Sequence, residues 1–253
     1  MCGIYGIYNY KQNSFAPDDL ASMGDVLHQR GPDDRGSFMD ETVMLGHNRL
    51  SIIDLSPNGR QPMSNEDNSI WITFNGEIYN YSELRDSLKQ NHQFRSKTDT
   101  EVIIHCYEEM GEDLWNRLEG MFAFCLWDRR KRTFYLVRDH YGIKPLYYVL
   151  HSDSLIFASQ IKGILSIKSF TPYYNYQAIS NFLSYFYIPG PETILKDVMH
   201  LPPGCFLKKT VDNTTITHFN RLNFNINPAL TEESLKDGIQ NKVREAVRKS
   251  IVA

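Results

Sequence analysis

Hydrophobic and polar positions along the chain predict mainly antiparallel sheet in its first two thirds. Segments 3–9 and 121–128 carry apolar side chains at both odd and even positions, which is typical of strands buried on both faces. Segment 70–81 is predicted as two strands joined at Asn75-Gly76, because this dipeptide accepts the positive φ angles of a tight hairpin. Further strands are predicted at 42–50, 133–139, 145–150 and 155–159.

Two helices interrupt the predicted strands. Pro17, followed by two aspartates, opens a segment that places Leu20, Met23 and Leu27 on one face and ends at 31–32. The second helix covers 98–111, where Thr98 and Glu101 have the spacing of a capping box and an apolar stripe ends at a glycine. Strands and helices in this order, without regular strand-helix-strand alternation, favour an α+β fold over a parallel doubly wound sheet.

The pattern changes beyond residue 165. Segment 187–204 concentrates proline and glycine, and segment 211–228 is polar, which predicts a hairpin and a linker. A helix resumes at Thr231 and presents one apolar row, formed by Leu235, Ile239, Val243 and Val247. Because such a row needs a packing partner, we interpret this helix as the beginning of a second domain.

Composition excludes several partner classes. The 253 residues are 42% hydrophobic and 23% charged, with a net charge of -3, so no basic surface for nucleic acid or anionic lipid is indicated. The longest apolar run, 121–127, is too short to cross a bilayer, and the N-terminal segment lacks the features of a signal peptide. We therefore expect a cytoplasmic protein without a nucleic-acid or membrane partner.

Neither cysteine nor histidine spacing predicts a metal site. The cysteines at 2, 106, 125 and 205 are widely separated and include no CxxC pair, so neither a disulfide framework nor a zinc site is expected. Seven of the eight histidines, at 28, 47, 105, 140, 151, 200 and 218, show no ligand pairing such as HExxH and are interpreted as surface or packing residues.

Cys2 is a candidate nucleophile because removal of Met1 would make it the N-terminal residue. A thiol reacts as the thiolate, so it needs a nearby base. The α-amine, whose ordinary pKa is about 7.7 to 8.0, could accept the thiol proton. The alternative interpretation is that Cys2 has no catalytic role and is only a small residue at the beginning of a strand.

Other residues could complete an amide-cleaving site. The Asn75 side-chain amide and the Gly76 backbone N–H could hold an oxyanion, although the pair is more often a turn. Arg49 could bind the carboxylate of an amino-acid substrate, and Glu77 and Asp99 could bind its ammonium group. Surface ion pairing remains the alternative role for these three residues.

Four sequence blocks occur in one order: MCGI at 1–4, HQRGPDDRG at 28–36, LGHNRLSIIDLSPNGRQPM at 45–63 and FNGEIYNYSELR at 74–85. They resemble the glutaminase domain of glutamine-hydrolysing asparagine synthetases, which are class II amidotransferases among the N-terminal nucleophile hydrolases. Later blocks, through LPPG at 201–204, continue the resemblance. The resemblance implies a four-layer αββα sandwich of two antiparallel sheets between helices.

The resemblance also implies roles for individual residues. Cys2 would attack the side-chain amide of glutamine and form a thioester, which water hydrolyses to glutamate after ammonia has left. Asn75 and Gly76 match the oxyanion hole, and Arg30 matches a supporting residue close to the nucleophile.

Three further positions match the part of the family's site that binds glutamine itself. Arg49 matches the residue that pairs with the glutamine carboxylate, whereas Glu77 and Asp99 match those that contact its ammonium group. The sequence departs from the family at Gln29, where histidine is usual, and at Gln160, where glutamate is usual.

The largest departure is the absence of an ATP-binding SGGxDS loop, because the chain contains no Gly-Gly pair. We therefore expect a glutaminase domain at 1–225 and, at 226–253, a linker with the first helix of a truncated synthetase domain. This chain would need no cofactor, since ATP and magnesium would serve the missing synthetase domain. The partner would be a synthetase domain or subunit that receives ammonia.

Alternatives remain at this stage. The chain could be a non-catalytic binding or regulatory module, an amidotransferase subunit for an acceptor other than aspartate, or a hydrolase of another amide. The RGPD and RLSI blocks disfavour the last of these. The sequence leaves the oligomeric state open, a homodimer included.

Overall fold

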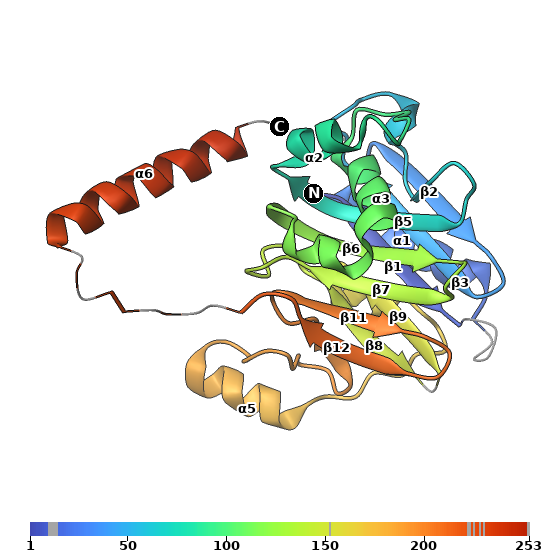
Figure 1. Ribbon diagram of the computed structural model, residues 1–253. Helices are drawn as coiled ribbons and strands as arrows, with labels where there is room; N and C mark the ends of the chain where they lie inside the picture. The colour runs from blue at the N-terminus through green and yellow to red at the C-terminus, as the bar shows by residue number, and fades with distance from the viewer. Residues whose placement is uncertain are drawn as a thin grey trace.

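Two six-stranded antiparallel sheets lie face to face in the computed structural model, with helices on their outer faces (Figure 1). The structure describes residues 1–9, 15–151, 153–221, 224, 226–227, 229 and 231–251. Three apolar clusters separate the layers, one between the sheets and one under the helices on each side. The prediction of an α+β four-layer sandwich is therefore confirmed.

The first sheet has the strand order β10-β8-β9-β1-β3-β2. Its strands are β1 (Gly3–Tyr8), β2 (Asp34–Met39), β3 (Val43–Arg49), β8 (Tyr147–His151), β9 (Ser154–Ala158) and β10 (Val198–His200). Helices α1 (Pro17–Leu27) and α4 (Ile161–Leu165) cover its outer face. The short 3-10 helix η2 (His28–Arg30) extends α1 toward the beginning of β1.

The second sheet has the order β12-β11-β7-β6-β5-β4. Its strands are β4 (Met63–Ser64), β5 (Ile70–Ile78), β6 (Gly120–Asp128), β7 (Thr133–Arg138), β11 (Cys205–Lys209) and β12 (Thr214–His218). Helix α3 (Asp99–Met110) lies on its outer face, followed by the 3-10 helix η4 (Gly111–Asn116). Helix α2 (Tyr81–Leu88) packs beside α3.

Strand β6 shows why apolar residues occur at both odd and even positions of some predicted strands. Phe122 and Phe124 face the cluster under α3, whereas Ala123 and Cys125 face the cluster between the sheets. Successive side chains of a strand point to opposite faces, so a strand in the middle of a four-layer sandwich meets an apolar layer on each side. The double-parity runs at 3–9 and 121–128 thus correctly predicted interior strands.

The predicted hairpin at Asn75-Gly76 is wrong. Both residues lie inside the single strand β5, where Gly76 pairs with Phe122 on β6. A Cβ at Gly76 would lie 2.3 Å from the Met121 carbonyl oxygen, so glycine is required by the close approach of two strands rather than by a turn. The Asn75-Gly76 pair therefore did mark a position that requires glycine, but the reason is close strand packing and not a turn.

Several other elements agree with the pattern, and some were missed. The helices predicted to begin at Pro17, near Thr98 and at Thr231 are present, as is the hairpin β11–β12. The sequence pattern does not predict β2, α2 or the helix α5 (Tyr176–Tyr185). Strand β2 lies at a sheet edge with alternating half-buried and exposed residues, so its apolar signal is weak.

Helix α6 (Glu232–Ser250) extends away from the sandwich (Figure 1). Its predicted apolar row is exposed, with Val243 and Val247 at 57% and 52%. Near its end, Lys249 pairs with Glu119 at 2.7 Å. Some positions of the predicted linker before it, including the boundary at residue 225, lie outside the described residues. No described helix combines the length and apolar character needed to cross a membrane.

Candidate active site

One pocket lies where β1, β3, β5 and α3 come together. Cys2 precedes β1, Arg49 ends β3, and Asp99 is the first residue of α3. Six of the seven residues singled out from the sequence line this pocket: Cys2, Arg49, Asn75, Gly76, Glu77 and Asp99. Sequence spacing could not bring them together, because they come from four different elements. Their roles in chemistry stay a prediction.

Cys2 is held beside the end of β3. Gly3 pairs with Asn48 in the β1–β3 ladder, so Cys2 lies at the end of the sheet, close to Leu50, the second residue after Asn48. The Leu50 amide donates a hydrogen bond to Cys2 Sγ at 3.4 Å. Burial raises the pKa of the thiol, and the bond from Leu50 opposes this rise. With Met1 attached, the thiol therefore favours its protonated form.

The edge of β5 beyond the short strand β4 offers backbone groups to the pocket. The Phe74 amide donates to Gln61 Oε1 at 2.7 Å, and the Ile78 amide donates to Asp99 Oδ2 at 3.0 Å. Gly76 lies midway between them, and alternate residues of a strand direct their amides to the same side. Its N–H therefore points away from β6, and no acceptor for it is found among the described residues.

Asn75 supplies a second donor. Its side chain is 1% exposed, and its Nδ2 has no hydrogen-bond partner within the described part of the chain. An unpaired buried donor costs stability, typically about 1–3 kcal/mol. A cost of this kind is expected where a protein keeps a group ready for a ligand. Asn75 Nδ2 and the Gly76 N–H could thus hold one negatively charged oxygen.

Two carboxyl groups, those of Glu77 and Asp99, also line the pocket. Burial raises the pKa of Asp99 to about 6, although backbone amides of Ile78 and Thr100 donate to it. Burial also raises the pKa of Glu77, and the Lys144 charge opposes this rise. A cation placed between these groups would offset the cost of keeping them charged. The pair is therefore suited to an ammonium group.

Arg49 is 6% exposed and is fixed by the loop that follows β3. Its Nη1 donates to the Ser56 carbonyl at 3.1 Å, and its Nη2 donates to the Asp54 carbonyl. Gly59 makes room for it, because a Cβ there would lie 2.1 Å from Nη2. Two carbonyl oxygens thus orient the guanidinium. Neither of these partners is a carboxylate, so these contacts do not neutralise its charge.

Arg30, the seventh predicted residue, is not among the residues that line the pocket. From η2, its Nε donates a hydrogen bond to the Cys2 carbonyl at 2.9 Å, so it holds the backbone of Cys2 in place. Gln29, beside it, is exposed. Gln160 precedes α4, and its Oε1 is buried without a hydrogen-bond partner in the described part of the chain.

Three further residues, not predicted from the sequence, shape the site. Lys144 lines the pocket, is 6% exposed, and has its pKa lowered chiefly by burial. The Gln61 side chain accepts the hydrogen bond of the Phe74 amide, as a neighbouring strand would. Its Nε2 donates to Thr100 Oγ1 at 3.1 Å. His47 Nε2 donates to the Phe74 carbonyl at 3.0 Å and thus joins the two sheets.

These residues gave weak sequence signals. Gln61 lies inside the block at 45–63, which marked it only as part of a motif. Burial lowers the pKa of His47 to about 4, so it is a neutral hydrogen-bonding group at physiological pH. Lys144 lies in the block RDHYGIKPLYY at 138–148, which could have drawn attention to it.

Comparisons with known proteins agree with this geometry. The glutamine amidotransferase domain family matches residues 1–220. Glutamine-hydrolyzing asparagine synthetase 1 of Bacillus subtilis is 37% identical over 257 residues, covering 99% of this chain and 39% of that protein. Glutamine-hydrolyzing asparagine synthetase 2 of the same organism is 46% identical over 169 residues, covering 66% and 22%. The chain thus spans less than half the length of these relatives.

Solved structures share the fold. Glutamine phosphoribosylpyrophosphate amidotransferase from B. subtilis, solved with ADP and GMP, matches with a TM-score of 0.66 at 17% identity, over 87% of this chain and 49% of that chain. An allosteric regulatory enzyme of purine biosynthesis matches with a TM-score of 0.65 at 18% identity over the same shares. The predicted N-terminal nucleophile hydrolase fold is therefore confirmed. Together with the match over residues 1–220, this places the chain in the glutamine amidotransferase domain family.

Proposed function

We propose that this chain hydrolyses the side-chain amide of glutamine to glutamate and ammonia through Cys2. The supporting observation is the placement of Asn75 Nδ2, which has no hydrogen-bond partner among the described residues, beside Gly76 in the pocket that Cys2 also lines. A thiol nucleophile and a preformed oxyanion site are the two parts that amide cleavage requires.

Removal of Met1 activates the proposed nucleophile. The free α-amine of Cys2 would then lie on the residue that carries the thiol and could accept its proton. In the structure, burial lowers the pKa of the Met1 amine, and the charges of Arg30 and Lys144 add to this effect. The same surroundings would help to keep a Cys2 amine neutral, as a base must be.

The proposed reaction conserves its protons. The thiol proton passes to the α-amine as sulfur bonds to the amide carbon, and the oxyanion is held by Asn75 and Gly76. The carbon–nitrogen bond then breaks, and the amine returns the proton so that ammonia leaves. A thioester remains on Cys2. Water adds to it, the carbon–sulfur bond breaks, and glutamate is released with the thiol restored.

Charge in the pocket selects the substrate. The Arg49 guanidinium would pair with the α-carboxylate of glutamine, while Glu77 and Asp99 would bind its α-ammonium group. This arrangement favours a free amino acid over a peptide, whose corresponding groups are uncharged amides. The hydrolysis uses only groups of this chain and needs no cofactor.

The ammonia would serve a synthetase domain or subunit, as the names of the B. subtilis relatives suggest. ATP and magnesium would act there, and the acceptor could be aspartate or another carboxylate. We place this function in the cytoplasm, where the free cysteines Cys2, Cys106, Cys125 and Cys205 would remain reduced.

The test combines activity with intact mass. Protein shown by mass spectrometry to lack Met1 should release glutamate from glutamine, and Cys2→Ala should show none above background. Cys2→Ser provides a near-isosteric control for folding and glutamine binding. Equal glutamate release by processed protein and Cys2→Ala would exclude the proposal. Retention of Met1 together with glutamine binding would instead indicate a binding module.

A further inference from the structure

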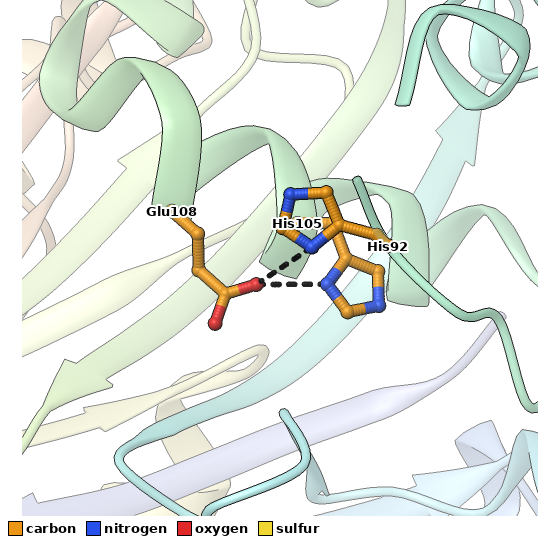
Figure 2. A group of neighbouring side chains, drawn as sticks. All are labelled: His92, His105 and Glu108. Atoms are coloured by element: carbon orange, nitrogen blue, oxygen red, sulfur yellow. Dashed lines mark hydrogen bonds and ion pairs between the residues drawn. The ribbon is translucent and has the colours of Figure 1, made fainter. Parts of the chain in front are cut away.

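Two histidines and a glutamate meet on the outer side of α3, where the second sheet's helical layer faces solvent (Figure 2). His105 and Glu108 are one turn apart on α3, and His92 comes from the segment that joins α2 to α3. Glu108 Oε2 lies 2.8 Å from His105 Nδ1 and 3.5 Å from His92 Nδ1. Figure 2 shows both imidazoles directed toward this one carboxylate.

The distances suit a shared metal ion. Zinc–nitrogen and zinc–oxygen bonds of about 2.0–2.2 Å at tetrahedral angles place neighbouring ligand atoms about 3.3 Å apart. The two observed separations, 2.8 and 3.5 Å, bracket this value. One ligand atom from each of the three residues lies within 4.8 Å of the others. Small side-chain adjustments would therefore bring them to ligating distance.

The outer nitrogens of both rings face further carboxylates. His92 Nε2 lies 2.8 Å from Glu109 Oε1. His105 Nε2 is buried and lies 3.8 Å from Glu66 Oε1 and 3.9 Å from Glu101 Oε1. Histidines that bind a metal through one nitrogen commonly direct the other N–H to a carboxylate, which fixes the tautomer and strengthens the ligand. His92 shows this arrangement at 2.8 Å, whereas the two carboxylates near His105 Nε2 lie just beyond hydrogen-bond distance.

We propose that His92, His105 and Glu108 form a site for a divalent transition-metal ion of the zinc class, with water completing the coordination. Two imidazoles and one carboxylate match the ligand preference of zinc, whereas magnesium and calcium prefer oxygen ligands. The three residues are not among the described residues that line the Cys2 pocket. The site is thus separate from the proposed glutaminase centre and does not depend on it.

The metal would tie the α2–α3 segment to the body of α3. This segment already contacts the helix, because Glu101 accepts hydrogen bonds from the Arg95 and Ser96 amides, both at 2.7 Å. Asn58, in the loop that fixes Arg49, donates to the Arg95 carbonyl at 3.0 Å. The ion would therefore act as a structural clamp behind one wall of the substrate pocket.

Metal binding to the whole chain tests this inference. A tag-free Cys2→Ala protein, which lacks the pocket thiol as a competing ligand, is stripped with chelator and titrated with zinc by calorimetry. We expect one equivalent to bind and to raise the melting temperature. Cobalt substituted for zinc should show the absorption bands of a tetrahedral site.

Substitutions test whether His92 and Glu108 bind the zinc ion. His92→Gln and Glu108→Gln, both at partly exposed positions, should each weaken zinc binding at least tenfold, while circular dichroism verifies their folding in chelator. His151→Gln, an exposed histidine on the other sheet, should leave the affinity unchanged. Absence of saturable zinc binding, or equal affinity in the parent, His92→Gln and Glu108→Gln, would overturn the proposal.

Discussion

At the scale of single residues, the site contains groups that the fold holds at a cost. Asn75 Nδ2 is buried and unpaired in the described structure, and burial raises the pKa of Asp99 to about 6. Neither feature stabilises the empty protein. Both would become favourable once an oxyanion and an ammonium group occupied the pocket, which is the expected mark of a ligand site.

Asn75→Ala should lower kcat for glutamine hydrolysis by roughly 100- to 1,000-fold, the usual effect of removing one oxyanion donor. KM should change little, because the donor acts mainly when charge develops on oxygen. Steady-state kinetics would measure both values. Asn65→Ala, another buried asparagine but one bonded to Ser69 and Glu108, should lower stability and leave kcat nearly unchanged. A kcat for Asn75→Ala within threefold of the parent would contradict this role.

Acid should weaken glutamine binding through Asp99. Its carboxyl, with a pKa of about 6, loses its charge as pH falls below that value, so the α-ammonium group loses a partner. KM should rise up to tenfold per pH unit below about pH 6. Asp99→Asn should have a high KM that no longer shows this dependence. A parental KM that stays flat between pH 7 and 5 would argue against the assignment.

The same group makes a prediction about stability. The folded pKa of Asp99 lies above its ordinary value of 3.8, so its contribution to stability is fully present below that value and is lost as pH rises through about 6. The shift corresponds to a cost of roughly 3 kcal/mol at neutral pH. Asp99→Asn should therefore melt at the same or a higher temperature at pH 7.5. Loss of several degrees would show a structural role.

At the scale of elements, the sequence predicted interior strands well and local turns poorly. Runs with apolar residues at both odd and even positions identified β1 and β6, because a central strand meets an apolar layer on each face. The Asn75-Gly76 signal failed because a close contact between strands and a turn both require glycine. Helix α5 was missed because its residues are mostly exposed, which blurs the apolar stripe.

Two glycine substitutions should separate these causes. Gly76→Ala should lower the melting temperature markedly and abolish hydrolysis, because its Cβ would lie 2.3 Å from the Met121 carbonyl oxygen. Gly238→Ala in α6 meets open space and should favour that helix by about 0.5–1 kcal/mol. Thermal melts followed by circular dichroism would measure both. Equal stability of Gly76→Ala and the parent would contradict the packing seen at β5.

At the scale of the whole molecule, the site is a product of the sandwich. Cys2 and Arg49 come from one sheet and Asn75 from the other, and His47 joins the sheets through the Phe74 carbonyl. The sequence blocks identified the residues, but only the layered fold shows how they share a pocket. The proposed metal site could not be predicted from the sequence, because His92 and His105 lie in separate elements and no spacing motif links them.

Deletion of residues after 221 should leave glutamine hydrolysis and the melting temperature nearly unchanged. No described residue of α6 is buried, and its ion pair between Lys249 and Glu119 is exposed on both sides, so solvent screens it and it contributes little to stability. Activity assays and thermal melts of the shortened chain would test this. A drop in activity would show that α6 supports the pocket.

The most direct test of the proposed chemistry is to trap the covalent intermediate. Protein lacking Met1 would be mixed with glutamine, quenched in acid within the first turnover, and digested for mass spectrometry. We predict a glutamyl group on the sulfur of the peptide that begins with Cys2, and its accumulation should precede steady glutamate release. Glutamate release without any adduct on that peptide, at every quench time, would contradict the account.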